Sequence, residues 1–201
     1  MLIRTGLLAV STLNDQTLDA ITHTLGARVP NVRVTNVQAI GSQRHWIADT
    51  LMQWCDEEEL DLVLTLGGTL PAPGPSVRET MPEAINDVIE RPLPGLAEAM
   101  RSHAAAETRL AYLERCVAGI RGRTLLLALP QGTAGALLFL TGVIDLIEPV
   151  VAHLHELPHA LIAEDELTLV ADEEIEPAAD EPQNSGLNAA DFAAFRRRRG
   201  K

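Results

Sequence analysis

Residues 61–83 read DLVLTLGGTLPAPGPSVRETMPE, and this stretch decides the fold. The apolar run at residues 62–64 predicts a strand of a parallel sheet that is covered on both faces. Gly67 and Gly68 follow this strand, and glycine permits backbone conformations and close approaches that other residues resist. In an open α/β sheet, ligands bind beyond the carboxyl ends of the strands. The stretch therefore predicts a ligand-binding loop at the end of a buried strand.

The residues before this stretch alternate between strand and helix patterns. Residues 2–10 predict a first strand, and Val32, Val34 and Val37 suggest a second, whereas residues 15–25 and 44–59 carry apolar side chains at helical spacing. In the second helix these side chains are Trp46, Ile47, Leu51, Trp54 and Cys55. With a strand over residues 60–66, the order is β-α-β-α-β, which predicts a parallel sheet with right-handed crossovers. We therefore expect an α/β fold built on a parallel sheet.

The second half of the chain predicts more helix and one more strand. Residues 81–93 and 94–119 have helical patterns, and residues 124–129 form an apolar strand. Residues 130–133, Pro-Gln-Gly-Thr, connect that strand to a helix over residues 134–154. A second strand-loop-helix junction is therefore expected at the same edge of the sheet.

Composition narrows the class of partner. The chain has 201 residues, 46% of them hydrophobic, which is enough for one well-packed core, and its net charge of −12 argues against a nucleic-acid footprint. The N-terminal apolar run fits a first strand better than a signal peptide, and no segment approaches the roughly 20 apolar residues of a membrane helix. Cys55 and Cys116 lie in predicted helices without metal or disulfide spacing, so we expect buried thiols in a reducing cytoplasm. A small molecule or a protein is the expected partner.

The sequence changes character after residue 157. Residues 163–182 are rich in carboxylates and contain no basic residue, which predicts a solvated linker. We therefore expect an α/β domain over residues 1–157, followed by an acidic linker and basic tail over residues 158–201. Residues 188–201 are interpreted either as a tail whose arginines fold back on the linker or as a docking peptide for a protein partner or an anionic surface.

Two junctions at the predicted edge suit a phosphorylated ligand. Backbone N–H groups at the helix start after residues 130–133 favour an anion, each such charge being worth about 0.3–1 kcal/mol when exposed. Residues 67–69, taken alone, are equally consistent with a simple turn. Arg78 and Glu79 end a loop rich in proline and glycine, and they are interpreted as either a surface salt bridge or a functional pair near the strand end.

Other catalytic classes find no support. The histidines are scattered, and His153 and His155 lack a third ligand at a convincing spacing, so zinc is not predicted. Ser11, Ser42 and Ser76 lack the flanking glycines of a nucleophile elbow, so covalent hydrolase chemistry is not predicted either.

The motifs LVLTLGGT, VRETMPEAINDVIERPLPGLAEAMR and LERCVAGIRGRTLLLALPQGTAGAL resemble the molybdopterin-binding domain of molybdenum cofactor biosynthesis proteins, of the stand-alone adenylyltransferase type. The similarity covers about residues 3–157. It implies a three-layer α/β/α sandwich with a mostly parallel sheet, usually a homotrimer, that binds the dithiolene pterin through the two loops. It also implies ATP and magnesium, with adenylylation of the terminal phosphate of molybdopterin. The ligand-binding residues implied are Gly67, Gly68, Thr69, Arg78, Pro130, Gly132 and Thr133.

Several positions differ from the family pattern. Leu66 and Leu70 replace the outer threonine and glycine of a Thr-Gly-Gly-Thr-Gly motif, and Glu79 stands where the family has aspartate. Residues 41–43 are Gly-Ser-Gln, where the family usually has proline and two acidic residues. Magnesium prefers carboxylate ligands, and neutral side chains are weaker substitutes. Glu79 and Asp15 are the carboxylates nominated as catalytic replacements, and no metal ligand is assigned.

Three functions therefore compete. One is an adenylyltransferase acting on molybdopterin with MgATP. Another is a catalytically degenerate paralogue that serves as a pterin-binding or assembly protein. A third is a remnant of a fused protein with a different phosphorylated ligand. The missing acidic pair weakens the first, and the retained LGGT and LPQG loops weaken a purely structural role.

Overall fold

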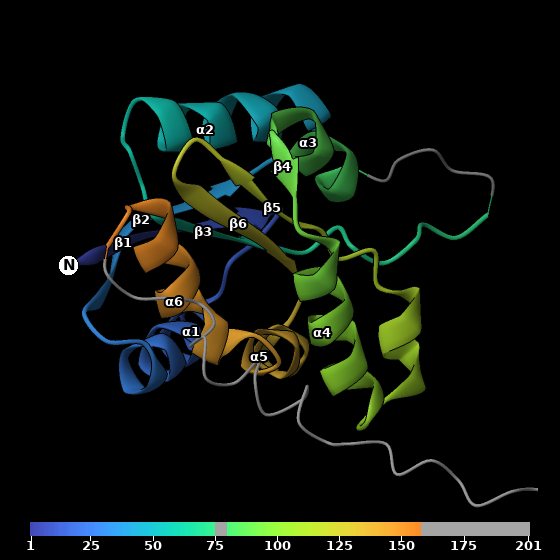
Figure 1. Cartoon of the computed structure of the whole chain (residues 1–201). Helices are drawn as coiled ribbons and strands as arrows, with labels where there is room; N and C mark the ends of the chain where they lie inside the picture. Colours follow the sequence, from blue (N-terminus) through green and yellow to red (C-terminus); the bar gives the residue numbers. More distant parts are fainter. Residues whose placement is uncertain (75–79, 158–201) are drawn as a thin grey trace, which may run out of the picture. The chain divides into compact units, whose positions relative to one another are not determined.

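The computed structural model describes residues 1–74 and 80–157, in which a six-stranded sheet lies between helices on both faces (Figure 1). The strands are β1 (Ile3–Val10), β2 (Val32–Ile40), β3 (Leu62–Leu66), β4 (Arg91–Pro92), β5 (Ala118–Arg121) and β6 (Thr124–Leu129). The helices are α1 (Asp15–Arg28), α2 (Arg44–Asp56), α3 (Met81–Val88), α4 (Pro94–Ala105), the 3₁₀ helix η1 (Arg109–Leu113), α5 (Thr133–Thr141) and α6 (Ile144–Leu154).

The sheet has the order β2-β1-β3-β6-β5-β4. β1, β2, β3 and β6 run parallel, whereas β5 pairs with both β6 and β4 in the antiparallel sense. β3 is central, and every one of its residues is buried, because helices cover both of its faces. The predicted α/β sandwich with a mostly parallel sheet is confirmed.

Alternate residues of the central strands pack into two separate core layers, one on each face of the sheet. Leu64 faces the layer formed with α1, α4, α5 and α6, whereas Val63 faces the layer formed with α2 and α3. The helix α2 contributes Trp54 to this second layer, with the side chain only 3% exposed. The helical spacing also predicts Trp46 on the buried face, and this is wrong, because Trp46 is 51% exposed.

Three segments differ from the prediction of continuous helix. In the segment predicted as helix over residues 81–93, α3 ends at Val88, and Arg91 and Pro92 form β4. In the segment predicted as helix over residues 94–119, α4 ends at Ala105, and the chain then forms η1 and the start of β5. Cys116 consequently lies between η1 and β5 rather than in a helix. The helix predicted over residues 134–154 is broken between α5 and α6, whose axes differ by 61°. Gly142 lies at this break, where an added Cβ would stand 2.8 Å from His103 Cβ.

Both cysteine thiols are buried and free. Burial raises the pKa of Cys55 to about 11 and that of Cys116 to about 12, because the thiolate would lose its hydration. Both groups are therefore protonated at neutral pH and are poor nucleophiles. The expectation of buried thiols is confirmed.

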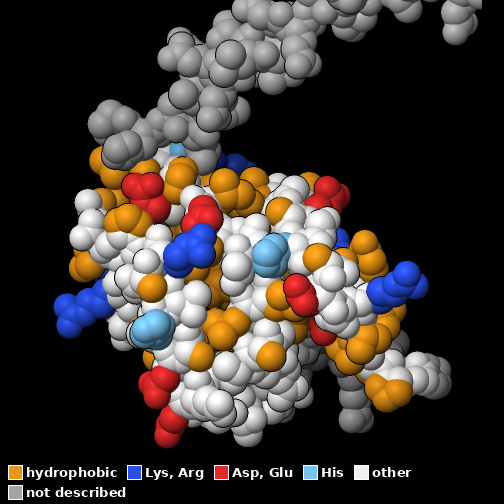
Figure 2. All heavy atoms as spheres, turned by 90° about the horizontal axis from the view of Figure 1, so that it is seen from below, with side chains coloured by type: hydrophobic (Ala, Val, Ile, Leu, Met, Phe, Trp, Pro, Cys, Tyr) orange, Lys and Arg blue, Asp and Glu red, His pale blue; other side chains and the backbone are white. Residues whose placement is uncertain are grey.

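The helices of the described residues are short relative to a bilayer. No single one is long and apolar enough to cross it, although the bent pair α5 and α6 would pass together by length and composition alone. On the face of the molecule that carries α1 and α5, arginine and histidine side chains are separated from one another by acidic, hydrophobic and uncharged groups (Figure 2). This face therefore shows no continuous basic patch in the part of the chain that the structure describes.

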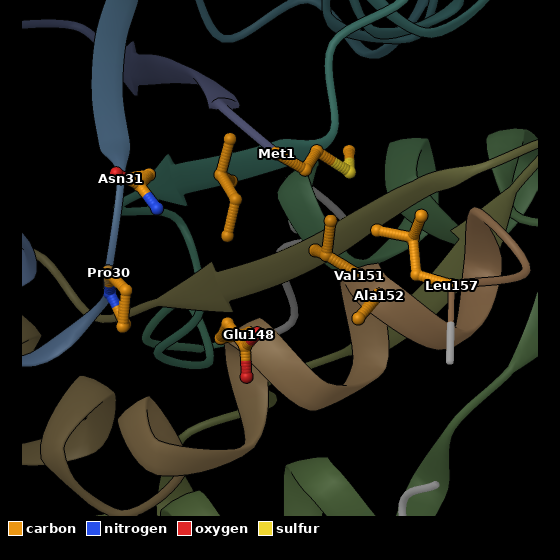
Figure 3. Close-up of a pocket in the computed structure, with 8 residues that line it drawn as sticks. Met1, Pro30, Asn31, Glu148, Val151, Ala152 and Leu157 are labelled. Atoms are coloured by element: carbon orange, nitrogen blue, oxygen red, sulfur yellow. The ribbon is translucent and has the colours of Figure 1, made fainter. Parts of the chain in front are cut away.

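Two cavities lie at the amino-terminal edge of the sheet. The first, of about 170 Å³, has Pro30 and Asn31 on one side and Val151 and Leu157 on the other (Figure 3). The second, of about 380 Å³, lies where β3 and β6 begin and is lined in part by Asp61. Asp61 is buried, and two contacts offset the cost of burying its carboxylate. Its Oδ2 accepts a hydrogen bond from the Arg4 N–H (2.7 Å), and its Oδ1 lies 2.8 Å from His155 Nε2. This side chain therefore ties the end of α6 to the sheet.

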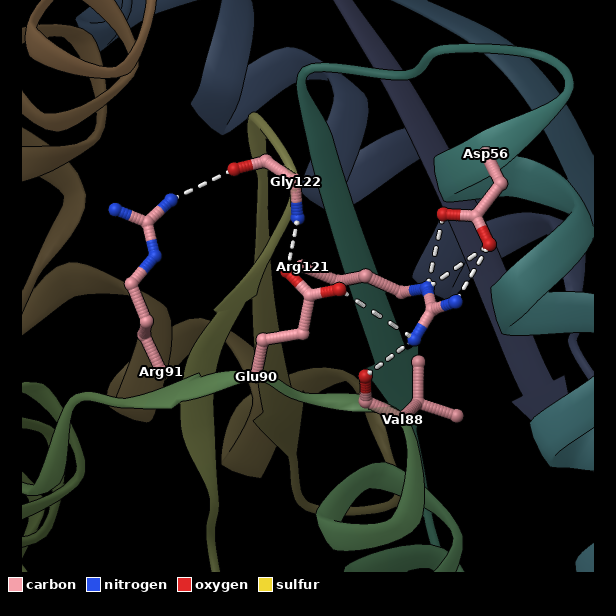
Figure 4. A network of polar contacts seen from close by, with 6 residues as sticks. All are labelled: Asp56, Val88, Glu90, Arg91, Arg121 and Gly122. Atoms are coloured by element: carbon pink, nitrogen blue, oxygen red, sulfur yellow. Dashed lines mark hydrogen bonds and ion pairs between the residues drawn. The ribbon is translucent and has the colours of Figure 1, made fainter.

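Arg121 joins several elements at one end of the sheet (Figure 4). Its Nε and Nη2 donate hydrogen bonds to the Asp56 carboxylate (2.9 and 2.6 Å), and its Nη1 donates to Val88 O (3.1 Å). Glu90 lies 4.0 Å from Arg121 and accepts a hydrogen bond from Gly122 N–H (3.0 Å). The guanidinium lowers the pKa of Asp56 through these hydrogen bonds. The network thus fixes the ends of α2 and α3 against the β5–β6 turn.

Arg121→Ala is expected to lower the free energy of unfolding at pH 7 by about 1 kcal/mol, a modest value because the network is partly solvated. Since the folded pKa of Asp56 is lowered, its stabilising contribution is present above the ordinary value of 3.8 and is lost as the pH falls through the lowered pKa. Urea denaturation at pH 7 and in acid measures both effects. Arg44→Ala, which removes an exposed pair with Asp87, serves as the control and should cost less. An equal loss for Arg121→Ala in acid and at neutral pH would contradict the role of the Asp56 charge.

Candidate functional site

The carboxyl ends of the four parallel strands meet at one edge of the sheet. The loop after β1 contacts the end of β2, because Ser11 N–H donates a hydrogen bond to Ile40 O (2.8 Å). The loop after β3 contacts the end of β6 in the same way, with Gly67 N–H donating to Leu129 O (3.0 Å). These bonds bring the two predicted junctions side by side, away from the cavities of the opposite edge.

The loop after β3 requires both of its glycines. Gly67 and Gly68 have φ angles of +88° and +72°, a region that side-chain-bearing residues rarely adopt. A Cβ at Gly67 would stand 3.6 Å from Gln131 Cβ, so the loop lies directly against the loop after β6. A Cβ at Gly68 would stand 3.1 Å from Met81 Cβ at the start of α3. The backbone of this loop can therefore approach a ligand more closely than one that carries side chains.

The loop after β6 exposes the start of α5. Gly132, with φ +86°, is the N-cap of α5; it provides no side-chain cap, and the first turn contains no acidic residue. The positive end of the helix dipole is therefore uncompensated by side chains of this turn, which favours an anion there. Thr133 Oγ1 lies 2.6 Å from Thr17 Oγ1, which joins the starts of α5 and α1. A small cavity of about 90 Å³ opens beside them, lined by Thr12, Leu13, Asn14, Thr17, Leu66, Gln131 and Gly132.

Thr69 anchors the glycine loop through hydrogen bonds to the rest of the protein. Its side chain is 1% exposed, and its Oγ1 donates a hydrogen bond to Glu114 Oε2 (2.5 Å). Its carbonyl oxygen accepts a hydrogen bond from Arg115 N–H (2.8 Å), and Arg115 Nη2 donates in turn to Glu83 Oε1 (2.7 Å). In this conformation Thr69 positions the loop and does not present its hydroxyl at the surface. Glu83, Glu114 and Arg115 were not identified from the sequence, and no local spacing links them to the glycines.

The predicted site residues fall into three groups. The first is brought together on adjacent loops and consists of Gly67, Gly68, Thr69, Pro130, Gly132 and Thr133. The second group is Asp15 alone, which is exposed in the first turn of α1. It follows the N-cap Asn14, whose Oδ1 accepts a hydrogen bond from Thr17 N–H (2.7 Å). Arg78 and Glu79 lie outside the described residues.

The described residues do not supply a magnesium site. Among residues 1–74 and 80–157, no group of three or more His, Cys, Asp or Glu side chains is placed to hold a metal ion. Ser42 and Gln43 precede α2 as exposed neutral side chains, and Gln43 makes no capping hydrogen bond. The following Arg44 is held by Asp87 through two hydrogen bonds of 2.6 and 2.5 Å. The donor set that a hard divalent cation prefers is therefore not present among the described side chains of this edge.

The site consists of two adjoining glycine loops at the carboxyl edge of a mostly parallel sheet, and one of these loops leads into a helix without a side-chain cap. A protein with such a site is suited to a small anionic ligand, for example a phosphorylated one. Comparison with known proteins agrees with this class. The chain belongs to the family of the probable molybdopterin binding domain, whose sequence model matches residues 7–153.

Several relatives carry names from molybdenum cofactor synthesis. The chain is 31% identical over 157 residues to the molybdopterin adenylyltransferase of Escherichia coli K12, covering 75% of this chain and 78% of that protein. It is 36% identical over 111 residues to the molybdopterin adenylyltransferase of Helicobacter pylori J99, covering 55% of this chain but only 61% of that protein. For the Helicobacter pylori 26695 protein of the same name the match spans 51% of its length.

Solved structures show the same fold. The molybdopterin biosynthesis enzyme MoaB of Thermus thermophilus superimposes with a TM-score of 0.70 at 35% identity, covering 79% of this chain and 99% of that one. A molybdopterin biosynthesis protein of Mycobacterium abscessus gives a TM-score of 0.63 at 27% identity, covering 76% and 96%. The expected family and fold are thus confirmed.

Proposed function

We propose that this protein binds molybdopterin in molybdenum cofactor biosynthesis, with the phosphate of the ligand held between residues 67–69 and 130–133. The observation that carries the proposal is the close approach of the two loops. Gly67 N–H donates a hydrogen bond to Leu129 O at the end of β6, and a Cβ at Gly67 would stand 3.6 Å from Gln131 Cβ. The names of the relatives support the same ligand. Backbone N–H groups and a helix dipole can hold an anion without basic side chains, which suits a chain of net charge −12.

A finer proposal is that the protein adenylylates molybdopterin with MgATP, as the names of its curated relatives suggest. In that reaction an oxygen of the pterin phosphate attacks the α-phosphorus of ATP, and pyrophosphate leaves. Catalysis would consist of positioning and charge stabilisation. Glu79 and Asp15 are the carboxylates proposed to act there in place of the absent acidic pair. The neutral Ser42 and Gln43 favour the second candidate, a pterin-binding or assembly protein without turnover.

The two candidates are separated by calorimetric titration of the purified protein with molybdopterin, with and without MgATP, and by an assay for adenylylated product in the same samples. Binding with turnover supports the adenylyltransferase. Binding without turnover supports the carrier or assembly role. Absence of binding contradicts both and directs attention to a different phosphorylated ligand.

The double variant Ser42→Asp with Gln43→Asp is expected to raise the rate of adenylyl transfer by about tenfold or more, because each 1.36 kcal/mol of transition-state stabilisation is worth a factor of ten. Restored carboxylates would also strengthen magnesium binding, which calorimetry measures independently of turnover. Gln53→Glu, which adds an acid near the opposite end of α2, is the control and should change neither quantity. An unchanged rate together with tighter magnesium binding would show that the missing acids do not limit turnover.

We further propose a homotrimer. Exposed apolar side chains on η1 support it: Leu110, Tyr112 and Leu113 are 67%, 66% and 53% exposed, and Leu70 on the glycine loop is 56% exposed. Apolar surface of this kind is typical of protein contacts. Light scattering should give three times the mass of the 21.7 kDa chain. We also propose that residues 188–201 bind a protein partner. That segment lies outside the described residues.

A further inference from the structure

The first turn of α2 presents an indole ring to solvent at the edge of the candidate site. The chain contains only two tryptophans, Trp46 and Trp54, both on α2. Trp54 is 3% exposed and packs in the core, whereas Trp46 is 51% exposed and belongs to neither core layer. Packing of the core therefore does not account for the aromatic ring at position 46.

The ring of Trp46 lies over the carboxyl end of β2. A Cβ added to Gly41, the residue that follows this strand, would stand 3.5 Å from Trp46 Cζ3. Ser11 is bonded to the end of β2, and a Cβ at Gly67 would stand 3.8 Å from Val10 O at the end of β1. The ends of β2, β1 and β3 thus lie in a row. Because neighbouring strands are about 4.8 Å apart, the indole lies roughly 10 Å along the edge from the glycine loop.

The dipole at the start of α2 also favours an anionic ligand. Gln43, the N-cap of α2, makes no capping hydrogen bond, and the first turn contains no acidic residue. His45 stands in this turn, its ring edge-on to Trp46 with centroids 5.6 Å apart. The positive end of the α2 dipole therefore faces the same edge as that of α5. A ligand that combines phosphate groups with a planar ring fits both ends of this row.

We propose that Trp46 is a stacking surface for the planar nitrogen heterocycle of the ligand whose phosphate occupies the two loops. Adenine and the pterin share this chemistry. The proposal rests on the proposed function in taking residues 67–69 and 130–133 as the phosphate site. An aromatic side chain accepts any such ring through its π face, so the stacking adds affinity for the ring while the loops hold the phosphate.

The test compares ligands with and without a ring. Trp46→Ala is expected to weaken binding of the ring-bearing ligand, ATP or molybdopterin, by about tenfold or more, as for base stacking on other aromatic side chains. It should leave binding of inorganic tripolyphosphate unchanged. Trp46→Phe should retain most of the affinity, because the stacking face is kept. Leu146→Ala removes another exposed apolar side chain, which lies on α6 and is 42% exposed, and this variant should bind every ligand like the unaltered protein.

Fluorescence provides a second readout that a merely structural role would not change. Stacking should quench the emission of Trp46, so the ring-bearing ligand quenches the full-length protein and tripolyphosphate does not. The Trp46→Phe variant, which retains only Trp54, should lose this quenching. Quenching by ATP alone identifies adenine as the stacked ring, and quenching by molybdopterin alone identifies the pterin.

The outcomes separate this inference from the proposed function. Molybdopterin and ATP that bind Trp46→Ala as tightly as the unaltered protein would overturn the stacking role and leave pterin binding intact. Tripolyphosphate binding as tight as that of both ring-bearing ligands would also overturn it. Absence of binding by all three ligands would overturn the phosphate site and the inference together.

Discussion

Gly6→Ala is expected to lower the free energy of unfolding by about 2–3 kcal/mol, because the added methyl group has no space in the core. Gly6 lies in β1, where a Cβ would stand 2.6 Å from Trp54 Cε3 and 2.8 Å from Leu60 Cδ1. Both side chains are almost fully buried, at 3% and 1% exposure. Relief of the clash requires movement of α2 away from the sheet. Urea denaturation monitored by circular dichroism measures the loss.

Gly26→Ala is the matched control for this variant. Gly26 lies inside α1, and nothing stands within 4 Å of the position of its Cβ. Alanine is a better helix former than glycine, so this variant should gain about 0.5–1 kcal/mol. A Gly6→Ala protein as stable as the unaltered one would contradict the close packing of Trp54 on β1.

The parallel part of the sheet could be predicted from the sequence, whereas its antiparallel edge could not. β3 and β6 are short apolar runs followed by glycine or proline, and their length and flanking residues favour strands covered on both faces. β5 is short and follows alanine-rich helical spacing, and it becomes a strand through its pairing with β6 and β4. Gly119 permits this position, since a Cβ there would stand 2.8 Å from Ile89 Cγ2. Such a contact between distant residues leaves no signal in local periodicity.

One part of the candidate site could likewise be predicted from the sequence, whereas another part could not. The glycines of residues 67–68 and Gly132 could be predicted, because positive φ is a local requirement that selects glycine. The support of the glycine loop by Glu114 could not, since it lies 45 residues from Thr69 and becomes a neighbour only in the folded protein. The exposure of Trp46 could not be predicted for a related reason. Helical spacing identifies an apolar stripe, but the neighbouring elements determine which member of the stripe they cover.

Gly68→Ala is expected to weaken molybdopterin binding by about tenfold or more, with a loss of about 1–2 kcal/mol in the free energy of unfolding. The stability loss reflects the φ angle of +72°, which costs an L-residue about that amount. The larger effect on binding has a separate cause. The added Cβ would stand 3.1 Å from Met81 Cβ, and Met81 is fully buried at the start of α3, so the loop rather than the helix must move. That movement displaces the N–H groups proposed to hold the phosphate.

Gly122→Ala separates the two causes. Gly122 also has a positive φ, +55°, but it lies in the turn between β5 and β6, with open space around the position of its Cβ. It should lose stability through the same backbone strain and bind molybdopterin like the unaltered protein. Calorimetric titration of both variants, with urea denaturation of each, provides the comparison. Equal affinities of the two variants for molybdopterin would mean that the ligand does not depend on the conformation of the loop after β3. A loss of affinity confined to Gly68→Ala would support a phosphate site built from the backbone, because the substitution adds no charge and removes no side-chain donor.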